Sequence, residues 1–152
     1  MVRDSHRVSI AGLDSGRGVN PPAVRTTLRR RGQATADTAW ERYADISLWP
    51  TWAPQILGVD ASTDRLAVGT TGTVKGPVGI RVSFEVLAVD ESARTWAWRA
   101  WIGARSAGLT LEHGVEARGT GSSTWLTVDG LAPIVLAYSP AAYLALGGLV
   151  RP

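Results

Sequence analysis

The sequence contains no cysteine and only two histidines. The absence of cysteine excludes disulfide bonds, iron–sulfur clusters, thiolate zinc sites and cysteine nucleophiles. His6 lies near the N-terminus, so His113 is the one histidine available to a folded domain, and we expect no metal site and no cofactor. Residues 1–10 are polar and lack the apolar core of a signal peptide, which favours a cytoplasmic protein.

Positive charge is concentrated at one end of the chain. Residues 1–31 carry seven arginines and two aspartates, whereas the remainder has more acidic than basic residues. A nucleic-acid-binding protein needs a basic face on its folded domain. The run Arg29-Arg30-Arg31 has no interleaved aromatic residue and is typical of a solvated strand end. We therefore expect no nucleic-acid partner.

The 152 residues, 45% of them hydrophobic, suit a single globular domain with a substantial core. Residues 1–22 are rich in glycine and proline without apolar periodicity, so we predict a flexible N-terminal extension. The domain is then expected to comprise residues 23–152.

The patterning within this domain predicts an α+β fold. Alternation of apolar and polar side chains favours a strand at 23–31, and Thr35 is placed to cap a helix over 36–44. A second helical turn at 46–52 should be stopped by prolines. Six further strands follow, which makes about seven antiparallel strands in all. They are expected at residues 56–61, 69–75, 80–89, 95–103, 107–117 and 122–129.

The last segment, residues 131–150, contains no charged residue. Its length allows a membrane anchor, but two prolines and a glycine pair argue against that reading. Ser139 followed by Pro140 resembles an N-cap and N1 pair, which predicts a break or kink there. A curved sheet needs a helix on its concave face, so we expect a long C-terminal helix covering the sheet and no membrane partner.

This order of elements, together with particular residues, resembles the START-like superfamily, also called SRPBCC. The segment 39–54 is similar to the helix pair of that family, with Trp40, Asp45 and a Trp-Pro-Thr-Trp run at 49–52. Residues 84–98 look like its central hairpin, and 109–115 like the next strand, which often has a histidine near position 113. The superfamily includes polyketide cyclases/dehydrases and lipid-transport proteins. The resemblance covers residues 23–150 and implies a helix-grip fold around an apolar cavity.

His113 is the candidate general acid or base, because the unperturbed pKa of histidine lies near neutrality. Strand alternation places it on one face with Leu109, Leu111 and Val115, away from Glu112 and Glu116. A partner must therefore come from another element, and Tyr138 or Tyr143 on the terminal helix is the candidate. The alternative is a hydrogen-bonded core histidine without a catalytic role.

Seven tryptophans suggest a pocket for ring systems, since tryptophan is large, rigid and flat. The alternative for several of them is plain core packing. We expect the ligand to be contacted by Trp49, Trp52, Ile56, Phe84, Trp98, Leu111 and Trp125. Ile56 departs from the polar aromatic residue that aromatic polyketide cyclases tend to carry. Some cyclases of the family place an arginine in the cavity, but whether Arg81 or Arg99 faces it stays open.

Two functions are consistent with this sequence. The resemblance favours a cyclase or dehydratase acting on a polyketide-like or other apolar aromatic metabolite. Because polar side chains are sparse, a non-catalytic carrier of a lipid or hydrophobic metabolite is almost as well supported, and the resemblance tips the prediction to the enzyme. Both readings expect a small hydrophobic or aromatic ligand, and a homodimer is left open. A protein-interaction module is a third, weaker alternative.

Overall fold

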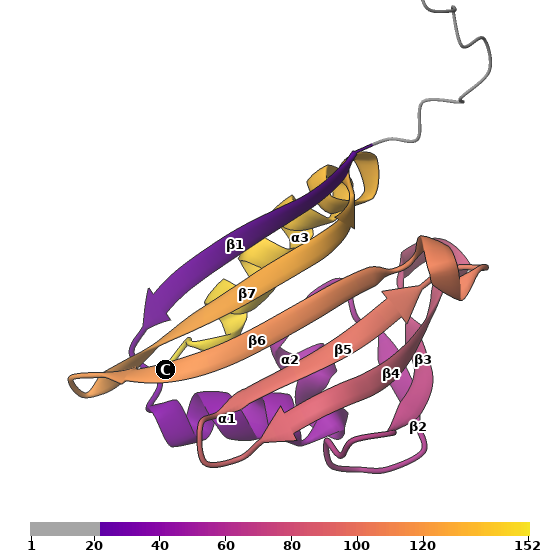
Figure 1. Cartoon of the computed structure of the whole chain (residues 1–152). Coiled ribbons are helices and arrows are strands. Elements are labelled where there is room, and N and C mark those ends of the chain that lie inside the picture. Colours follow the sequence, from indigo (N-terminus) through magenta and orange to yellow (C-terminus); the bar gives the residue numbers. More distant parts are fainter. Residues whose placement is uncertain (1–21) are drawn as a thin grey trace, which may run out of the picture.

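The structure, a computed structural model, describes residues 22–152. These residues form one antiparallel sheet, two short helices after its first strand and a long C-terminal helix (Figure 1). The helices are α1 (Ala36–Ala44), α2 (Trp49–Trp52) and α3 (Ala132–Leu149). The strands are β1 (Ala23–Gly32), β2 (Gly58–Ala61), β3 (Thr71–Lys75), β4 (Arg81–Asp90), β5 (Thr95–Trp101), β6 (Leu109–Arg118) and β7 (Gly121–Leu131).

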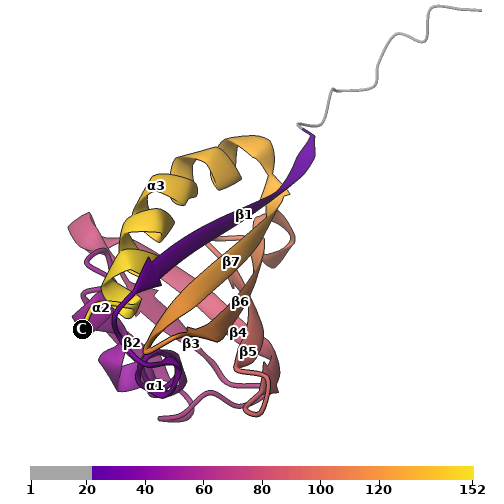
Figure 2. The same cartoon turned by 90° about the vertical axis from the view of Figure 1, so that its left-hand side faces the viewer.

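The sheet has the order β1-β7-β6-β5-β4-β3-β2, so β1 and β2 form its two edges. The segment containing α1 and α2 crosses from one edge to the other, and all later strands pair with their predecessors. A register shift between Val86 and Ala88 interrupts the pairing of β4 with β5. Such a bulge bends a strand, and it contributes to the strong curvature seen in both views (Figures 1 and 2).

The first helix follows from local chemistry. The Thr35 side chain accepts a hydrogen bond from the Thr38 backbone N–H at 3.1 Å, which satisfies one of the otherwise unpaired amides of the first turn. Ala36, Trp40 and Tyr43 repeat at helical spacing and are buried. This apolar face packs α1 against β6 and β7 at one end of the sheet.

Helix α3 covers the concave face and lies along β1 and β7 (Figure 2). It is one continuous helix, so the N-cap and break predicted at Ser139-Pro140 are wrong. The Ser139 hydroxyl instead donates to the Val135 carbonyl at 2.7 Å. Pro140 leaves the Leu136 carbonyl without its intrahelical partner. Leu136 and Pro140 lie on the exposed side of the helix, where water can satisfy the Leu136 carbonyl.

The C-terminal end of α3 is fastened tightly to the domain. A Cβ atom added to Gly148 would lie 2.2 Å from the Trp52 carbonyl oxygen, so only glycine permits this approach. Arg42 donates to the carbonyls of Leu149 and Arg151 at 2.7 and 2.6 Å. The last turn of the helix is thereby satisfied and anchored beside α2.

By length and composition α3 could cross a membrane, and 33% of its residues are buried. In this fold its buried side covers the sheet. Its outer side carries the exposed apolar residues Leu136 and Leu144.

The predicted α+β helix-grip architecture is confirmed, with element boundaries within two residues of those expected. The strands expected at 56–61 and 69–75 begin two residues later, at Gly58 and Thr71. The extension predicted at residues 1–22 lies outside the described residues, apart from Pro22, and so does His6.

The close approach at Gly148 gives a direct test of how α3 is held. Gly148→Ala and Gly147→Ala both gain about 1 kcal/mol of helix propensity. At Gly147 the added methyl meets only the movable guanidinium of Arg30, whereas at Gly148 it meets the backbone of Trp52. We expect the free energy of unfolding of Gly148→Ala to be about 1–3 kcal/mol below that of Gly147→Ala. Urea denaturation followed by circular dichroism measures both, and equal stabilities would contradict the tight contact.

Candidate functional site

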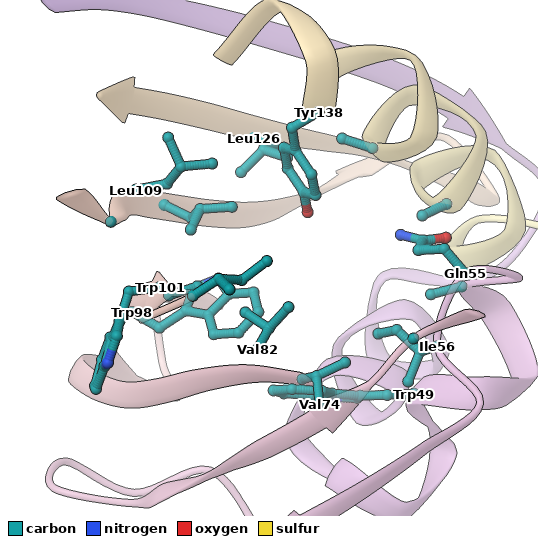
Figure 3. Close-up of a pocket in the computed structure, with 18 of the residues that line it drawn as sticks. Trp49, Gln55, Ile56, Val74, Val82, Trp98, Trp101, Leu109, Leu126 and Tyr138 are labelled. Atoms are coloured by element: carbon teal, nitrogen blue, oxygen red, sulfur yellow. The ribbon is translucent and has the colours of Figure 1, made fainter. Parts of the chain in front are cut away.

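A cavity of about 620 Å³ lies between the concave face of the sheet and α3 (Figure 3). This volume is in the range that holds one drug-sized organic molecule. The lining residues come from α2, α3, the connection after α2, and five of the strands with their loops. They are Trp49, Trp52, Ala53, Gln55, Ile56, Val74, Gly76, Pro77, Ile80, Val82, Trp96, Trp98, Ala100, Trp101, Ile102, Ala107, Gly108, Leu109, Leu111, His113, Leu126, Ile134, Ala137, Tyr138, Ala142, Ala145 and Leu146.

The space exists because α3 turns small side chains toward the sheet. Ala137, Ala142 and Ala145 line the cavity from the helix. Opposite them stand large residues of the sheet, including Leu109 and Trp98 (Figure 3). Bulky residues at the three alanines would fill the space, so the composition of α3 determines the volume of the cavity.

The mouth of the cavity is marked by the lining residues that are also exposed to solvent. On one side these are Ile80, after the turn at Pro77–Gly79, and Ile102, after β5. On the other side stand Ile134 and Ala137 in the first turns of α3. The rim is therefore apolar, which suits the entry of an apolar molecule.

Tryptophans at the closed end are held with their polar edges turned into the protein. The indole N–H of Trp49 donates to the Tyr43 carbonyl at 2.9 Å, and that of Trp52 donates to the Arg42 carbonyl at 2.7 Å. Trp49 also lies 5.4 Å from Trp98 between ring centroids. Because the N–H groups are already paired, these rings present apolar surface to the cavity.

His113 lies in a buried hydrogen-bond chain whose directions can be assigned. Trp98 Nε1–H donates to His113 Nε2 at 3.0 Å, so Nε2 is unprotonated and the ring proton sits on Nδ1. His113 Nδ1–H then donates to the Tyr43 hydroxyl at 3.1 Å. Tyr43 donates to Thr124 Oγ1 at 2.9 Å, because the Thr124 hydroxyl proton goes to the Gly114 carbonyl at 2.9 Å. Every hydrogen-bonding position of the imidazole is occupied.

The surroundings keep this histidine neutral. Burial lowers the pKa of His113 from 6.5 to about 3. The ring of Trp96 stacks on it at 4.6 Å between centroids and 10° between planes. A proton added at Nε2 would face the N–H of Trp98, donor against donor. The geometry therefore favours the core-histidine alternative, and a general acid–base role for His113 stays a prediction that its contacts oppose.

Two polar side chains do face the cavity from its walls. The Tyr138 hydroxyl points into it from α3, and the Gln55 amide points into it from the connection after α2 (Figure 3). Burial alone raises the pKa of Tyr138 to about 12, so the hydroxyl keeps its proton at neutral pH. Among the residues that the structure describes, none hydrogen-bonds this hydroxyl.

Of the residues expected to contact a ligand, Trp49, Trp52, Ile56, Trp98 and Leu111 line the cavity, as do His113 and Tyr138. Three other residues that we expected at the site, Phe84, Trp125 and Tyr143, lie outside the cavity lining.

Phe84 is fully buried behind the cavity wall, with its ring 5.6 Å from those of Trp49 and Trp98. Trp125 covers Gly114 on the opposite face of the sheet, where its ring occupies the place of a Cβ atom. Tyr143 is on the outer side of α3, 46% exposed, beneath the guanidinium of Arg30 at 4.3 Å. None of the three lines the cavity.

The two arginines considered as cavity residues, Arg81 and Arg99, also lie outside the cavity lining. Arg99 donates to the carbonyls of Arg105 and Ser106 and to the hydroxyl of Thr110, which ties down the connection between β5 and β6. Arg81 is exposed at the start of β4 and is not part of the lining. The cavity-facing arginine found in some cyclases therefore has no counterpart at either position.

Sequence reasoning missed the true partners of His113. They are Tyr43 from α1 and Trp98 from β5, where we had expected Tyr138 or Tyr143. A signal existed for Tyr43, because it shares the helical period of Ala36 and Trp40 and must face the core. Gln55 carried no comparable signal, since it lies in an irregular connection.

Comparison with known proteins agrees with this architecture. The family model described as "Polyketide cyclase / dehydrase and lipid transport" matches residues 23–150, and the chain belongs to that family. No protein of curated function has a significantly similar sequence.

Two solved structures share the fold. The structure of Ara h 8.0201 superposes with a TM-score of 0.65 at 16% identity, covering 85% of this chain and 98% of that one. Ginseng major latex-like protein 151 from Panax ginseng superposes with a TM-score of 0.67 at 14% identity, covering 86% and 99%. At these identities the likeness concerns the fold alone.

The buried state of His113 has a measurable consequence for stability. Its pKa is about 3 when folded and near 6.5 when unfolded, so below pH 6.5 only the unfolded chain takes up the proton. Acidification therefore favours unfolding. Between pH 7 and pH 5 we expect the free energy of unfolding of the wild type to fall by about 2 kcal/mol more than that of His113→Phe. Urea denaturation of both proteins across this range measures the difference.

If the free energy of unfolding depended on pH equally in the two proteins, a neutral His113 would be contradicted. As a control, nitrogen NMR of the wild type at pH 5 should show the His113 ring neutral and protonated on Nδ1. A titration midpoint near 6.5 would mean that the ring is accessible and able to exchange protons.

Proposed function

We propose that this protein binds one neutral, apolar, ring-containing organic molecule in the cavity beneath α3 and acts as a binding or carrier protein. The observation that carries the proposal is the cavity itself, which is large, lined by tryptophan and aliphatic side chains, and closed at one end. Apolar surface moved from water into such a site gains about 25 cal/mol per Å². For a ligand of three fused rings we expect dissociation constants on the order of micromolar.

A second candidate is a cyclase or dehydratase, and the Tyr138 hydroxyl favours it because a proton donor faces the cavity. Catalysis would then come mostly from imposed orientation and exclusion of water. The two candidates differ in one readout. A carrier returns its ligand chemically unchanged, whereas an enzyme converts a reactive polyketide-like substrate faster than buffer does.

The cytoplasmic location and the absence of nucleic-acid and membrane partners remain predictions from the sequence, which leaves a homodimer open. They do not affect how the cavity binds its ligand.

Filling the cavity should weaken ligand binding without unfolding the domain. Ala142→Phe places a ring inside the cavity from the middle of α3, while Leu144→Phe places the same ring on the exposed side of the same helix. Tryptophan fluorescence is titrated with 9-phenanthrol and, separately, with a long-chain fatty acid. We expect saturable quenching by phenanthrol at micromolar levels in the wild type and in Leu144→Phe. Ala142→Phe should bind at least about tenfold more weakly, because its ring and the ligand compete for one space.

Saturation by the fatty acid alone would favour a lipid carrier over a ring-binding protein. Equal binding by the wild type and both variants would place the ligand outside the cavity and contradict the proposal. Circular dichroism of each variant checks that the fold is retained.

A further inference from the structure

The electrostatic character of the cavity is uniform. Among the lining residues, all of which lie in the described part of the chain, there is no aspartate, glutamate, lysine or arginine. The imidazole of His113 is neutral and both its nitrogens are engaged. A ligand that carried a charge into this space would lose its hydration without gaining a counter-ion, which is strongly unfavourable.

Charged groups near the cavity are committed elsewhere. The guanidinium of Arg99 is bound to the β5–β6 connection, and that of Arg105 lies over the Trp101 ring, 4.8 Å from its centroid. Arg105 also pairs with Glu85. These contacts hold both cations outside the cavity lining, so the interior stays uncharged.

One hydroxyl is available to a ligand inside this apolar space. Tyr138 projects its oxygen from α3 toward the wall formed by Trp98 and Trp101 (Figure 3). A ring system lying against these tryptophans would have Tyr138 above it. The phenolic O–H can donate to a carbonyl or hydroxyl oxygen and can also accept a hydrogen bond. The Gln55 amide reaches the same space from the side (Figure 3).

We propose that the cavity selects neutral ring-bearing ligands that carry a hydroxyl or carbonyl oxygen, and that the Tyr138 hydroxyl is the specificity-determining residue that recognises this oxygen. The proposal rests on the cavity-binding function and adds its selectivity. A ligand without such an oxygen leaves Tyr138 unpaired in an apolar site. A carboxylate of the same shape is rejected because nothing inside neutralises it.

Three ligands of one shape test the selectivity on the wild-type protein: 9-phenanthrol, phenanthrene and phenanthrene-9-carboxylate. Equilibrium dialysis at pH 7 gives a dissociation constant for each, and phenanthrol is neutral at this pH. We expect phenanthrol to bind most tightly and the carboxylate at least about tenfold more weakly than phenanthrol. The same measurement in high salt shows whether any carboxylate binding depends on the nearby cations of Arg99 and Arg105.

Two matched substitutions test the residue. Tyr138→Phe and Tyr143→Phe each remove one hydroxyl from α3, the first inside the cavity and the second on the outer surface. Tyr138→Phe should weaken phenanthrol binding roughly three- to tenfold and leave phenanthrene unchanged, as expected for the loss of one hydrogen bond. Tyr143→Phe should leave both dissociation constants unchanged.

The outcomes separate the selectivity from the underlying function. If phenanthrene and phenanthrol bind the wild type but Tyr138→Phe changes neither, or weakens both equally, Tyr138 does not recognise the oxygen, while cavity binding stands. Carboxylate binding as tight as that of phenanthrol would overturn the selection of neutral ligands. If none of the three ligands binds the wild type, both the selectivity and the binding function are overturned.

Discussion

The structure depends on a long helix that crosses the concave face of a curved sheet without filling the space beneath it. Two features make this possible. The C-terminal end of α3 is held against Trp52 at Gly148 and capped by Arg42, while its N-terminal end continues directly from β7. Between these fixed ends the helix presents alanines to the sheet. A helix held at both ends cannot collapse onto the sheet, so the cavity is a consequence of where α3 is fastened.

The closed end of the cavity is held by polar contacts within an aromatic cluster. The hydrogen-bond chain through His113 joins α1, β5, β6 and β7 through one residue of each, namely Tyr43, Trp98, His113 and Thr124. Every donor in the chain has an acceptor, and a fully satisfied buried network favours one arrangement of the surrounding core. A network of this kind is better suited to holding the cavity wall than to exchanging protons with a ligand.

Much of the fold was predictable because its signals are local. Alternation placed Leu111 and His113 on the inner face, and the cap at Thr35 gave the start of α1. The face of the sheet on which a side chain lies was harder to predict where it depends on the pairing of distant segments. Trp125 is opposite Gly114 and therefore shares the outer face with it, whereas its neighbour Leu126 is opposite His113 and faces inward. Without the register, a tryptophan on an apolar strand could be assigned to either face.

Helical geometry could have separated the two tyrosines of α3. Tyr138 and Tyr143 are five residues apart, which places them about 140° from one another around the helix. Both cannot face one cavity, and the structure turns Tyr138 inward.

This arrangement also bears on whether the protein is a carrier or an enzyme. A catalyst must bind the transition state more strongly than the substrate, and in an uncharged cavity the groups able to respond to developing charge are few. Tyr138 can donate one hydrogen bond to an oxygen that becomes more negative, while His113 is already engaged. Any reaction promoted here must therefore depend on the intrinsic reactivity of the ligand, while the cavity orients the ligand and excludes water. The same set of lining side chains is sufficient, without further assumption, for selective binding of a neutral molecule.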